Sequence, residues 1–268
     1  MKEKLAKLIK GVTLALLYIM TYTIFQAVYM CIAALVLHYS GGDIWDVNNH
    51  SGIVLIFSAI SSLLVYLAIY YLRKTGLNKV ICTKHLSLIN VIAAFILAIG
   101  FRLLTGVYML WAENTAVFKE TIETLENAYD FTTMKSVDIL LLAACVVFLA
   151  PVFEEILLRG MVLKELESCM PVWLAIFLQG VLFGIMHGNI VQFVFTTIIG
   201  IVLGIVYHKT KNLSMTIFVH LFFNCSAVLE VTEKSTLPVT VAVGVLMVVV
   251  SMVMIFYTHR KDNYTVCD

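Results

Sequence analysis

The chain has 268 residues, of which 61% are hydrophobic and only 13% are charged, and its formal net charge is +1. A soluble domain carries about 25% charged residues, so the composition excludes an ordinary soluble protein and indicates a polytopic membrane protein. The small net charge gives no support for a nucleic-acid partner. The partner that the composition does imply is the lipid bilayer.

Apolar segments of membrane-spanning length recur along the whole chain. A span needs about 20 apolar residues, and the sequence offers eight candidates: 12–37, 53–72, 89–110, 137–159, 172–187, 190–207, 213–229 and 238–257. We expect an all-α polytopic membrane protein whose roughly eight transmembrane helices form a bundle around an intramembrane polar cavity. No break divides the apolar segments, so residues 1–268 should form a single membrane domain.

Basic residues alternate between successive loops. The segment before the first span carries four lysines, the 38–52 loop has no lysine or arginine, and the 73–88 loop again carries four basic residues. The positive-inside rule then predicts that both termini are cytoplasmic. The outer 111–136 loop holds five acidic residues, and we favour a solvated loop there. Its apolar residues have a loosely helical spacing, so a short surface helix is the alternative. Short loops and a compact chain favour a bacterial plasma membrane.

Two adjacent glutamates, Glu154 and Glu155, lie in the fourth apolar segment and are followed by Arg159. A carboxylate in a bilayer costs several kcal/mol, so such groups are treated as functional hypotheses. On a helix Glu155 and Arg159 share one stripe and can pair at i,i+4, whereas Glu154 points away from the arginine. This predicts that Arg159 neutralises Glu155 and that Glu154 is free to act as a base. The alternative is a purely structural ion pair.

Two histidines occupy equally apolar surroundings. Phe183 precedes His187 by four residues, so its ring can pack that imidazole into position. His220 precedes Asn224 by four residues, and two neutral donors on one stripe suit an oxyanion hole. Each pair alone is better explained by a helix–helix polar contact. A shared cavity explains all of them together.

The ordered motifs EExxxR, FxxxH and HxxxN resemble the CAAX prenyl protease and bacteriocin-processing family, also called the CPBP or Abi family of intramembrane endopeptidases. The resemblance covers residues 137–229, which we take as the catalytic core. It implies a CAAX-type, glutamate-dependent endopeptidase of eight helices. It also implies that Glu154 and His187 activate water, that His220 and Asn224 stabilise the oxyanion, and that further residues shape the site. Those further residues are Glu155 and Arg159.

The residue types fit peptide hydrolysis, which requires an activated water, an electrophilic stabiliser and a proton donor for the leaving amine. The sequence lacks the HExxH motif of zincins and the GxSxG motif of serine hydrolases. We favour direct activation of water by Glu154, with no cofactor required. The alternative is zinc bound by Glu154, His187 and His220, because two histidines and a glutamate can ligate that metal.

One geometric difficulty concerns the depth of the histidines. At 1.5 Å per residue, His187 lies roughly 24 Å along its helix from Pro171, and His220 lies only about 10 Å from Leu213. Either the fifth helix begins outside the membrane, or the fourth continues through Lys164–Glu167 into the cytoplasm. In both cases the site would open toward the cytoplasm.

Two other functions use the same residue types. Intramembrane glutamate, histidine and arginine also build proton relays in transporters, but the chain shows no paired repeat of the kind that transporters carry. A non-catalytic immunity or binding protein of the same fold is the second alternative. If the chain is an enzyme, we expect a membrane-associated peptide or membrane protein as its substrate, in preference to a prenylated protein.

Overall fold

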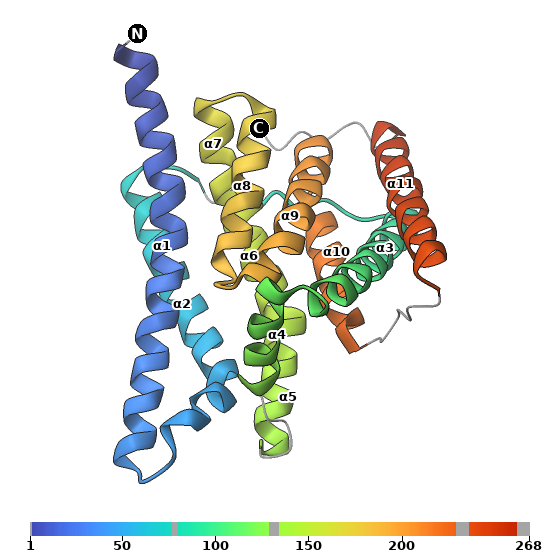
Figure 1. Cartoon of the computed structure of the whole chain (residues 1–268). Helices are drawn as coiled ribbons and strands as arrows, with labels where there is room; N and C mark the ends of the chain where they lie inside the picture. The colour runs from blue at the N-terminus through green and yellow to red at the C-terminus, as the bar shows by residue number, and fades with distance from the viewer. Residues whose placement is uncertain (1, 77–79, 129–133, 229–235, 262–268) are drawn as a thin grey trace.

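The computed structural model describes residues 2–76, 80–128, 134–228 and 236–261, and every regular element among them is a helix (Figure 1). The longer α-helices are α1 (Lys2–Tyr39), α2 (Ser51–Leu72), α3 (Leu88–Glu113), α4 (Ala116–Ala128), α8 (Val172–Met186), α9 (Ile190–Thr210), α10 (Leu213–Cys225) and α11 (Leu237–Lys261). The helical segment between α4 and α8 comprises α5 (Ser136–Ala144), η3 (Cys145–Leu149), α6 (Ala150–Glu155), η4 (Ile156–Val162) and α7 (Leu163–Cys169). Short 3₁₀ turns, η1 (Ile44–His50) and η5 (Ser226–Val228), complete the described elements.

The all-α polytopic membrane fold is confirmed. Within the described residues, six helices are long and apolar enough to cross a membrane, and α8 and α10 are shorter apolar helices between them. Large apolar side chains are exposed along these helices, for example Leu64 at 63% and Val253 at 63%. Such surface suits contact with lipid rather than water, so the chain is an integral membrane protein. The count of eight spans and the cytoplasmic placement of the termini stay predictions.

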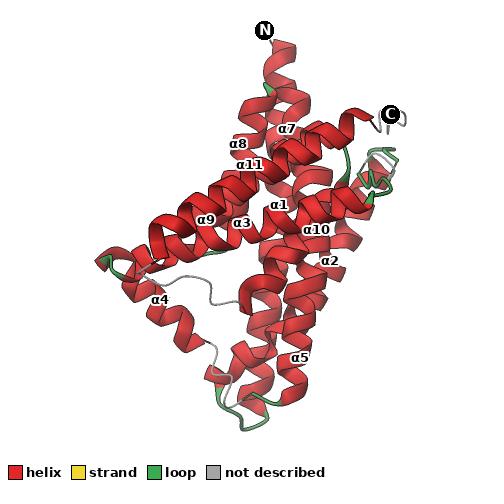
Figure 2. Cartoon of the chain, turned by 90° about the vertical axis from the view of Figure 1, so that its right-hand side faces the viewer, coloured by secondary structure: helices red, strands yellow, loops and turns green. Residues whose placement is uncertain are grey.

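The helices form two groups. Figure 1 shows α1 and α2 side by side along one edge of the molecule, with α3 and α11 on the opposite side. Figure 2 shows that α3 and α11 are steeply inclined to α2 and α5. One buried cluster joins α1, α2, α7 and α8, and a second joins α3, α9, α10 and α11. The segment that carries Glu154 and Glu155 belongs to the first group and faces α10 of the second.

The fourth predicted span is a continuous helical run from Ser136 to Cys169. It therefore continues about ten residues beyond the predicted end at 159. This is the longer fourth helix that we expected as one of two ways to bring the two histidines to a common depth. Two π-helical segments, η3 and η4, flank the short α6 that ends with the glutamate pair. π-Helical turns are rare and often mark functional sites, because they change the phase of the side chains around the axis.

The favoured expectation of a solvated loop over residues 111–136 is wrong for its central part, and the alternative of a short helix is present: Ala116–Ala128 is the helix α4. Phe118 and Ile122 lie one turn apart on it and pack against Tyr108 and Val191. Burial of this apolar stripe explains why an acidic segment forms a helix here. Residues 129–133 lie outside the described part of the chain.

Glycines let α8 and α9 approach closely. A Cβ atom on Gly180 would lie 2.5 Å from Ile201 Cγ1 and 3.0 Å from the Ile201 backbone nitrogen. A Cβ atom on Gly184 would lie 2.8 Å from the Phe193 carbonyl oxygen. Small residues at such spacing are the usual means of close helix contact in membranes. This contact fixes the face of α8 that carries Phe183.

The turn between α8 and α9 ends the first helix at His187. Gly188 has a φ of +71°, the left-handed conformation that commonly terminates helices. Asn189 then caps α9, because its side-chain oxygen accepts a hydrogen bond of 2.8 Å from the Gln192 backbone N–H. The sequence His-Gly-Asn therefore places the imidazole of His187 at a defined helix end.

Candidate active site

The predicted Glu155–Arg159 ion pair is present and completely buried. Arg159 Nη1 donates to Glu155 Oε1 at 2.7 Å, and both side chains are 0% exposed. Arg159 Nη2 also donates to the Gly200 carbonyl oxygen at 3.1 Å. The guanidinium lies 5.4 Å from the centre of the Phe183 ring. Buried charges need this degree of pairing to be tolerated.

His220 lies between the two glutamates. Its Nδ1 is 3.0 Å from Glu155 Oε1, and its Nε2 is 3.7 Å from Glu154 Oε2. A carboxylate oxygen only accepts, so the hydrogen-bond network assigns the imidazole hydrogen to Nδ1. Glu155 thereby fixes both the orientation and the tautomer of His220. The other nitrogen is left facing Glu154.

Glu154 differs from Glu155 in access. Its side chain is 14% exposed, whereas that of Glu155 is 0% exposed. The 3.7 Å separation from His220 Nε2 is too long for a good hydrogen bond, and polar groups at such a distance commonly share a water. With both carboxylates ionised and His220 neutral, these two glutamates and Arg159 carry one net negative charge.

Phe183 connects the two histidines. Its ring packs edge-on against His187 at 4.8 Å and against His220 at 5.8 Å between centroids. His187 Nδ1 lies 2.9 Å from the Phe183 carbonyl oxygen, so Nδ1 carries the hydrogen and Nε2 keeps its lone pair. The structure thus brings both imidazoles into contact with the Phe183 ring. No direct hydrogen bond joins His187 to Glu154 in the described part of the chain.

Asn224 lies one turn beyond His220 and reaches the segment before the glutamates. Its side-chain nitrogen donates to the Val146 carbonyl oxygen at 2.8 Å. Val146 belongs to the π-helical segment η3. An amide nitrogen has two hydrogens, so one donor remains for another acceptor. The predicted oxyanion role of Asn224 therefore rests on that second hydrogen.

One buried polar side chain was missed from the sequence. Gln179 is 0% exposed, and its side-chain nitrogen donates to the Gly200 carbonyl oxygen at 3.1 Å, the acceptor that Arg159 also uses. The sequence carries the same kind of signal for Gln179 as for the two histidines, namely a polar side chain inside an apolar helix. The motif patterns contained no position for it.

The zinc alternative needs Glu154, His187 and His220 around one ion. Across the described ranges, no group of three or more His, Cys, Asp or Glu side chains has an arrangement that could hold a metal ion. The Nδ1 atom of His220 is held by Glu155, which is itself paired with the positively charged Arg159, and Nε2 faces Glu154. As they lie here, Glu154, His187 and His220 do not converge on one ion.

Comparison with known proteins finds a family match over the region that holds these residues. Residues 136–226 match the family described as type II CAAX prenyl endopeptidase Rce1-like. The chain is also 24% identical over 221 residues to the "Putative membrane peptidase YdiL" of Bacillus subtilis (strain 168), covering 80% of this chain and 88% of the relative. No solved structure gives a significant match. The two findings support the family resemblance that the three motifs indicated, because the matched residues 136–226 contain EExxxR, FxxxH and HxxxN.

Proposed function

We propose that this chain is an intramembrane endopeptidase that hydrolyses a peptide bond of a membrane-associated peptide or protein. The observation that carries the proposal is the position of His220 between a buried, neutralised carboxylate and an accessible one. This arrangement lies inside the region that matches a family of membrane endopeptidases. We take residues 137–229 as the catalytic core of a single membrane domain.

Glu154 is the proposed general base. A water beside Glu154 and His220 Nε2 gives its proton to the Glu154 carboxylate as its oxygen attacks the scissile carbonyl carbon. The same proton then passes to the leaving amine nitrogen when the C–N bond breaks, which restores the carboxylate. Atoms and charge balance without a covalent enzyme intermediate.

The oxyanion of the tetrahedral intermediate needs donors that are already oriented. We assign this role to the second amide hydrogen of Asn224 and to His220 Nε2, which takes up a proton from bulk water before the attack and keeps it through the cycle. His187 Nε2, with its lone pair free, assists Glu154 in holding the water or in proton transfer. These assignments follow the family resemblance and the tautomers described above.

Three residues act through the others. Glu155 orients His220, Arg159 neutralises Glu155, and Phe183 packs against both histidines. Arg159 thereby offsets the charge of the carboxylate that holds the His220 imidazole.

We propose no metal requirement. The poor fit of Glu154, His187 and His220 to a zinc site supports this choice, and the chemistry above needs only the residues of this chain. A strong chelator should therefore leave cleavage unchanged.

The substrate is a peptide segment that can enter the bilayer from its surface. A bacterial plasma membrane is the proposed location, in keeping with the Bacillus subtilis relative. The continuation of the Glu154 helix to Cys169 supports a site that opens toward the predicted cytoplasmic side. Peptide maturation or processing of another membrane protein fits this placement.

The test is cleavage of a quenched peptide library by detergent-solubilised protein, with the products identified by mass spectrometry. Wild type is compared with Glu154→Gln, each with and without chelator. Internal peptide-bond cleavage that disappears only in the variant supports a metal-independent glutamate protease. Loss of cleavage in chelator as well would contradict the metal-free mechanism. Cleavage that persists in Glu154→Gln would remove Glu154 as the base.

A further inference from the structure

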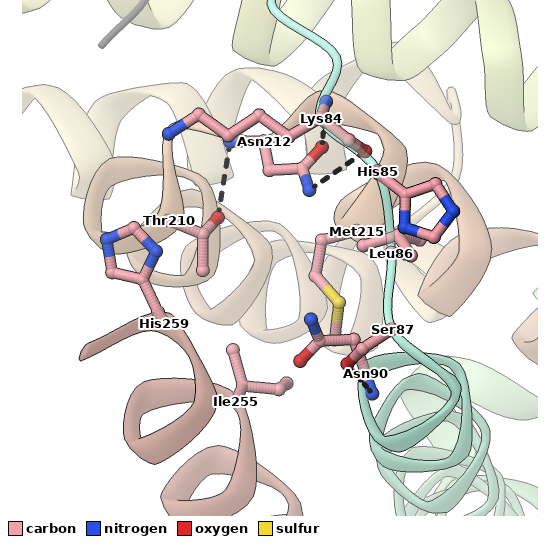
Figure 3. Close-up of a pocket in the computed structure, with 10 residues that line it drawn as sticks. All are labelled: Lys84, His85, Leu86, Ser87, Asn90, Thr210, Asn212, Met215, Ile255 and His259. Atoms are coloured by element: carbon pink, nitrogen blue, oxygen red, sulfur yellow. Dashed lines mark hydrogen bonds between the residues drawn. The ribbon is translucent and has the colours of Figure 1, made fainter. Parts of the chain in front are cut away.

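A polar pocket lies at the ends of four helices (Figure 3). None of the residues of the candidate active site, which we call the Glu154 cluster (Glu154, Glu155, Arg159, Phe183, His187, His220 and Asn224), lines it. Its volume is about 300 Å³, near the lower end of the range for small-molecule pockets. The wall is formed by the start of α3, the α9–α10 turn and the last turns of α11. The lining residues are Lys84, His85, Leu86, Ser87, Asn90, Thr210, Asn212, Met215, Ile255 and His259.

The pocket has a fixed frame. The side-chain oxygen of Asn212, a residue only 6% exposed, accepts hydrogen bonds from the Lys84 backbone N–H at 3.0 Å and the Ser214 N–H at 3.1 Å. Thr258 on α11 donates to the Asn90 side-chain oxygen at 2.5 Å. These bonds join the 84–90 segment to α10 and α11, so the pocket is a property of the fold rather than of one loop.

The lining chemistry is cationic and rich in donors. No aspartate or glutamate is among the ten lining residues, which include a lysine and two histidines. Within the described residues, the Lys84 ammonium makes no ion pair, and the Asn90 side-chain nitrogen makes no hydrogen bond. The Ser87 hydroxyl caps α3 as an acceptor and keeps its own hydrogen available. A half-buried lysine that pairs with no acid in the described ranges, beside two spare donors, suits an oxyanion.

The location is a membrane surface. The apolar helices α3 and α10 begin at Leu88 and Leu213, and α9 and α11 end at Thr210 and Lys261. All four ends meet at the pocket, so it lies where these helices leave the bilayer. The positive-inside pattern predicts that this surface is cytoplasmic. Basic pockets between helices on that side are suited to phosphate-bearing headgroups.

We propose that this pocket binds a phosphate group, supplied by the headgroup of an anionic phospholipid. Lys84 provides the charge, and Asn90 and Ser87 provide neutral donors to the phosphate oxygens. Bound lipid would brace α3 against α10 and α11. This site is independent of the proposed protease chemistry, because none of its lining residues belongs to the Glu154 cluster.

The test is binding of phosphatidylglycerol to the full-length detergent-solubilised protein, measured by native mass spectrometry and by thermal stabilisation. Phosphatidylcholine serves as the zwitterionic lipid control, and glycerol phosphate and inorganic phosphate test a soluble source. Lys84→Gln removes the charge but keeps the backbone bonds to Asn212. Lys209→Gln is the matched control, because Lys209 is exposed on the same end of α9 but does not line the pocket.

We expect phosphatidylglycerol to bind in preference to phosphatidylcholine, and Lys84→Gln to weaken that binding roughly five- to tenfold. Lys209→Gln should change it less than twofold. Soluble phosphate compounds that bind with the same Lys84 dependence, without a lipid preference, would overturn the lipid source. The site itself would be overturned if Lys84→Gln and Lys209→Gln weakened binding equally. It would also be overturned if neither phosphatidylglycerol nor a soluble phosphate compound bound in preference to phosphatidylcholine.

Discussion

Removal of Arg159 is the most informative perturbation of stability. Its guanidinium is 2.7 Å from Glu155, and both side chains are 0% exposed. In Arg159→Met the Glu155 carboxylate would stay buried without its cation. Breaking a buried pair in this way costs about 3–5 kcal/mol. For a chain of this size that corresponds to a fall in apparent Tm of roughly 10 °C.

The double variant Arg159→Met/Glu155→Gln tests the cause of that loss. A neutral glutamine keeps an oxygen that can accept from His220 Nδ1 but removes the unpaired charge. We expect the double variant to recover most of the stability, with a residual cost of about 1–2 kcal/mol from the lost bond to Gly200. Thermal unfolding of purified protein in detergent measures all three proteins.

The matched control is the exposed pair of Lys119 and Glu123. It has the same i,i+4 spacing, a separation of 3.8 Å and side chains that are 65% and 58% exposed. Lys119→Met should cost no more than about 0.5 kcal/mol. The reasoning fails if Arg159→Met is as mild as Lys119→Met, or if the double variant is less stable than Arg159→Met alone.

Three further predictions concern the elements that position the site. Gly180→Val should lower the free energy of unfolding by about 1–3 kcal/mol, because a Cβ atom at this position would lie 2.5 Å from Ile201 Cγ1. Gly188→Asn is its control and should be nearly neutral in the same unfolding assay, since asparagine tolerates the left-handed conformation. Asn189→Ala should cost about 0.5–2 kcal/mol through loss of the α9 cap and should reduce peptide cleavage, whereas Asn189→Asp keeps the acceptor and should retain most of the stability; equal losses in the two would argue against the cap. Asn224→Leu should lower kcat about 10²–10³-fold with little change in KM if its amide is an oxyanion donor, and a change confined to KM would contradict that role.

The sequence contained enough information to predict the contacts within single helices. The i,i+4 rule predicted the Glu155–Arg159 pair, and the same spacing placed Phe183 against His187. The extension of the fourth helix was foreseen as one of two ways to bring the histidines to one depth. These predictions needed only the rise and turn of a helix.

Contacts between helices were harder to predict from the sequence. The bond from His220 to Glu155 depends on how α10 rotates against a helix whose phase is altered by two π-helical segments. A fixed turn of 100° per residue cannot anticipate that change. The bond from Asn224 to Val146 has the same origin. The helix α4 was only the less favoured alternative to a loop, because the acidic composition outweighed the i,i+4 spacing of Phe118 and Ile122.

The central claim is that Glu154 activates the water that cleaves the peptide bond. Its most direct test is the kcat/KM for a cleaved peptide in Glu154→Gln beside Glu113→Gln, which alters an exposed carboxylate at the end of α3. Both proteins should keep the wild-type unfolding temperature. We predict a loss of about 10²–10⁴-fold in Glu154→Gln and wild-type activity in Glu113→Gln. Activity of folded Glu154→Gln close to that of wild type would contradict the account.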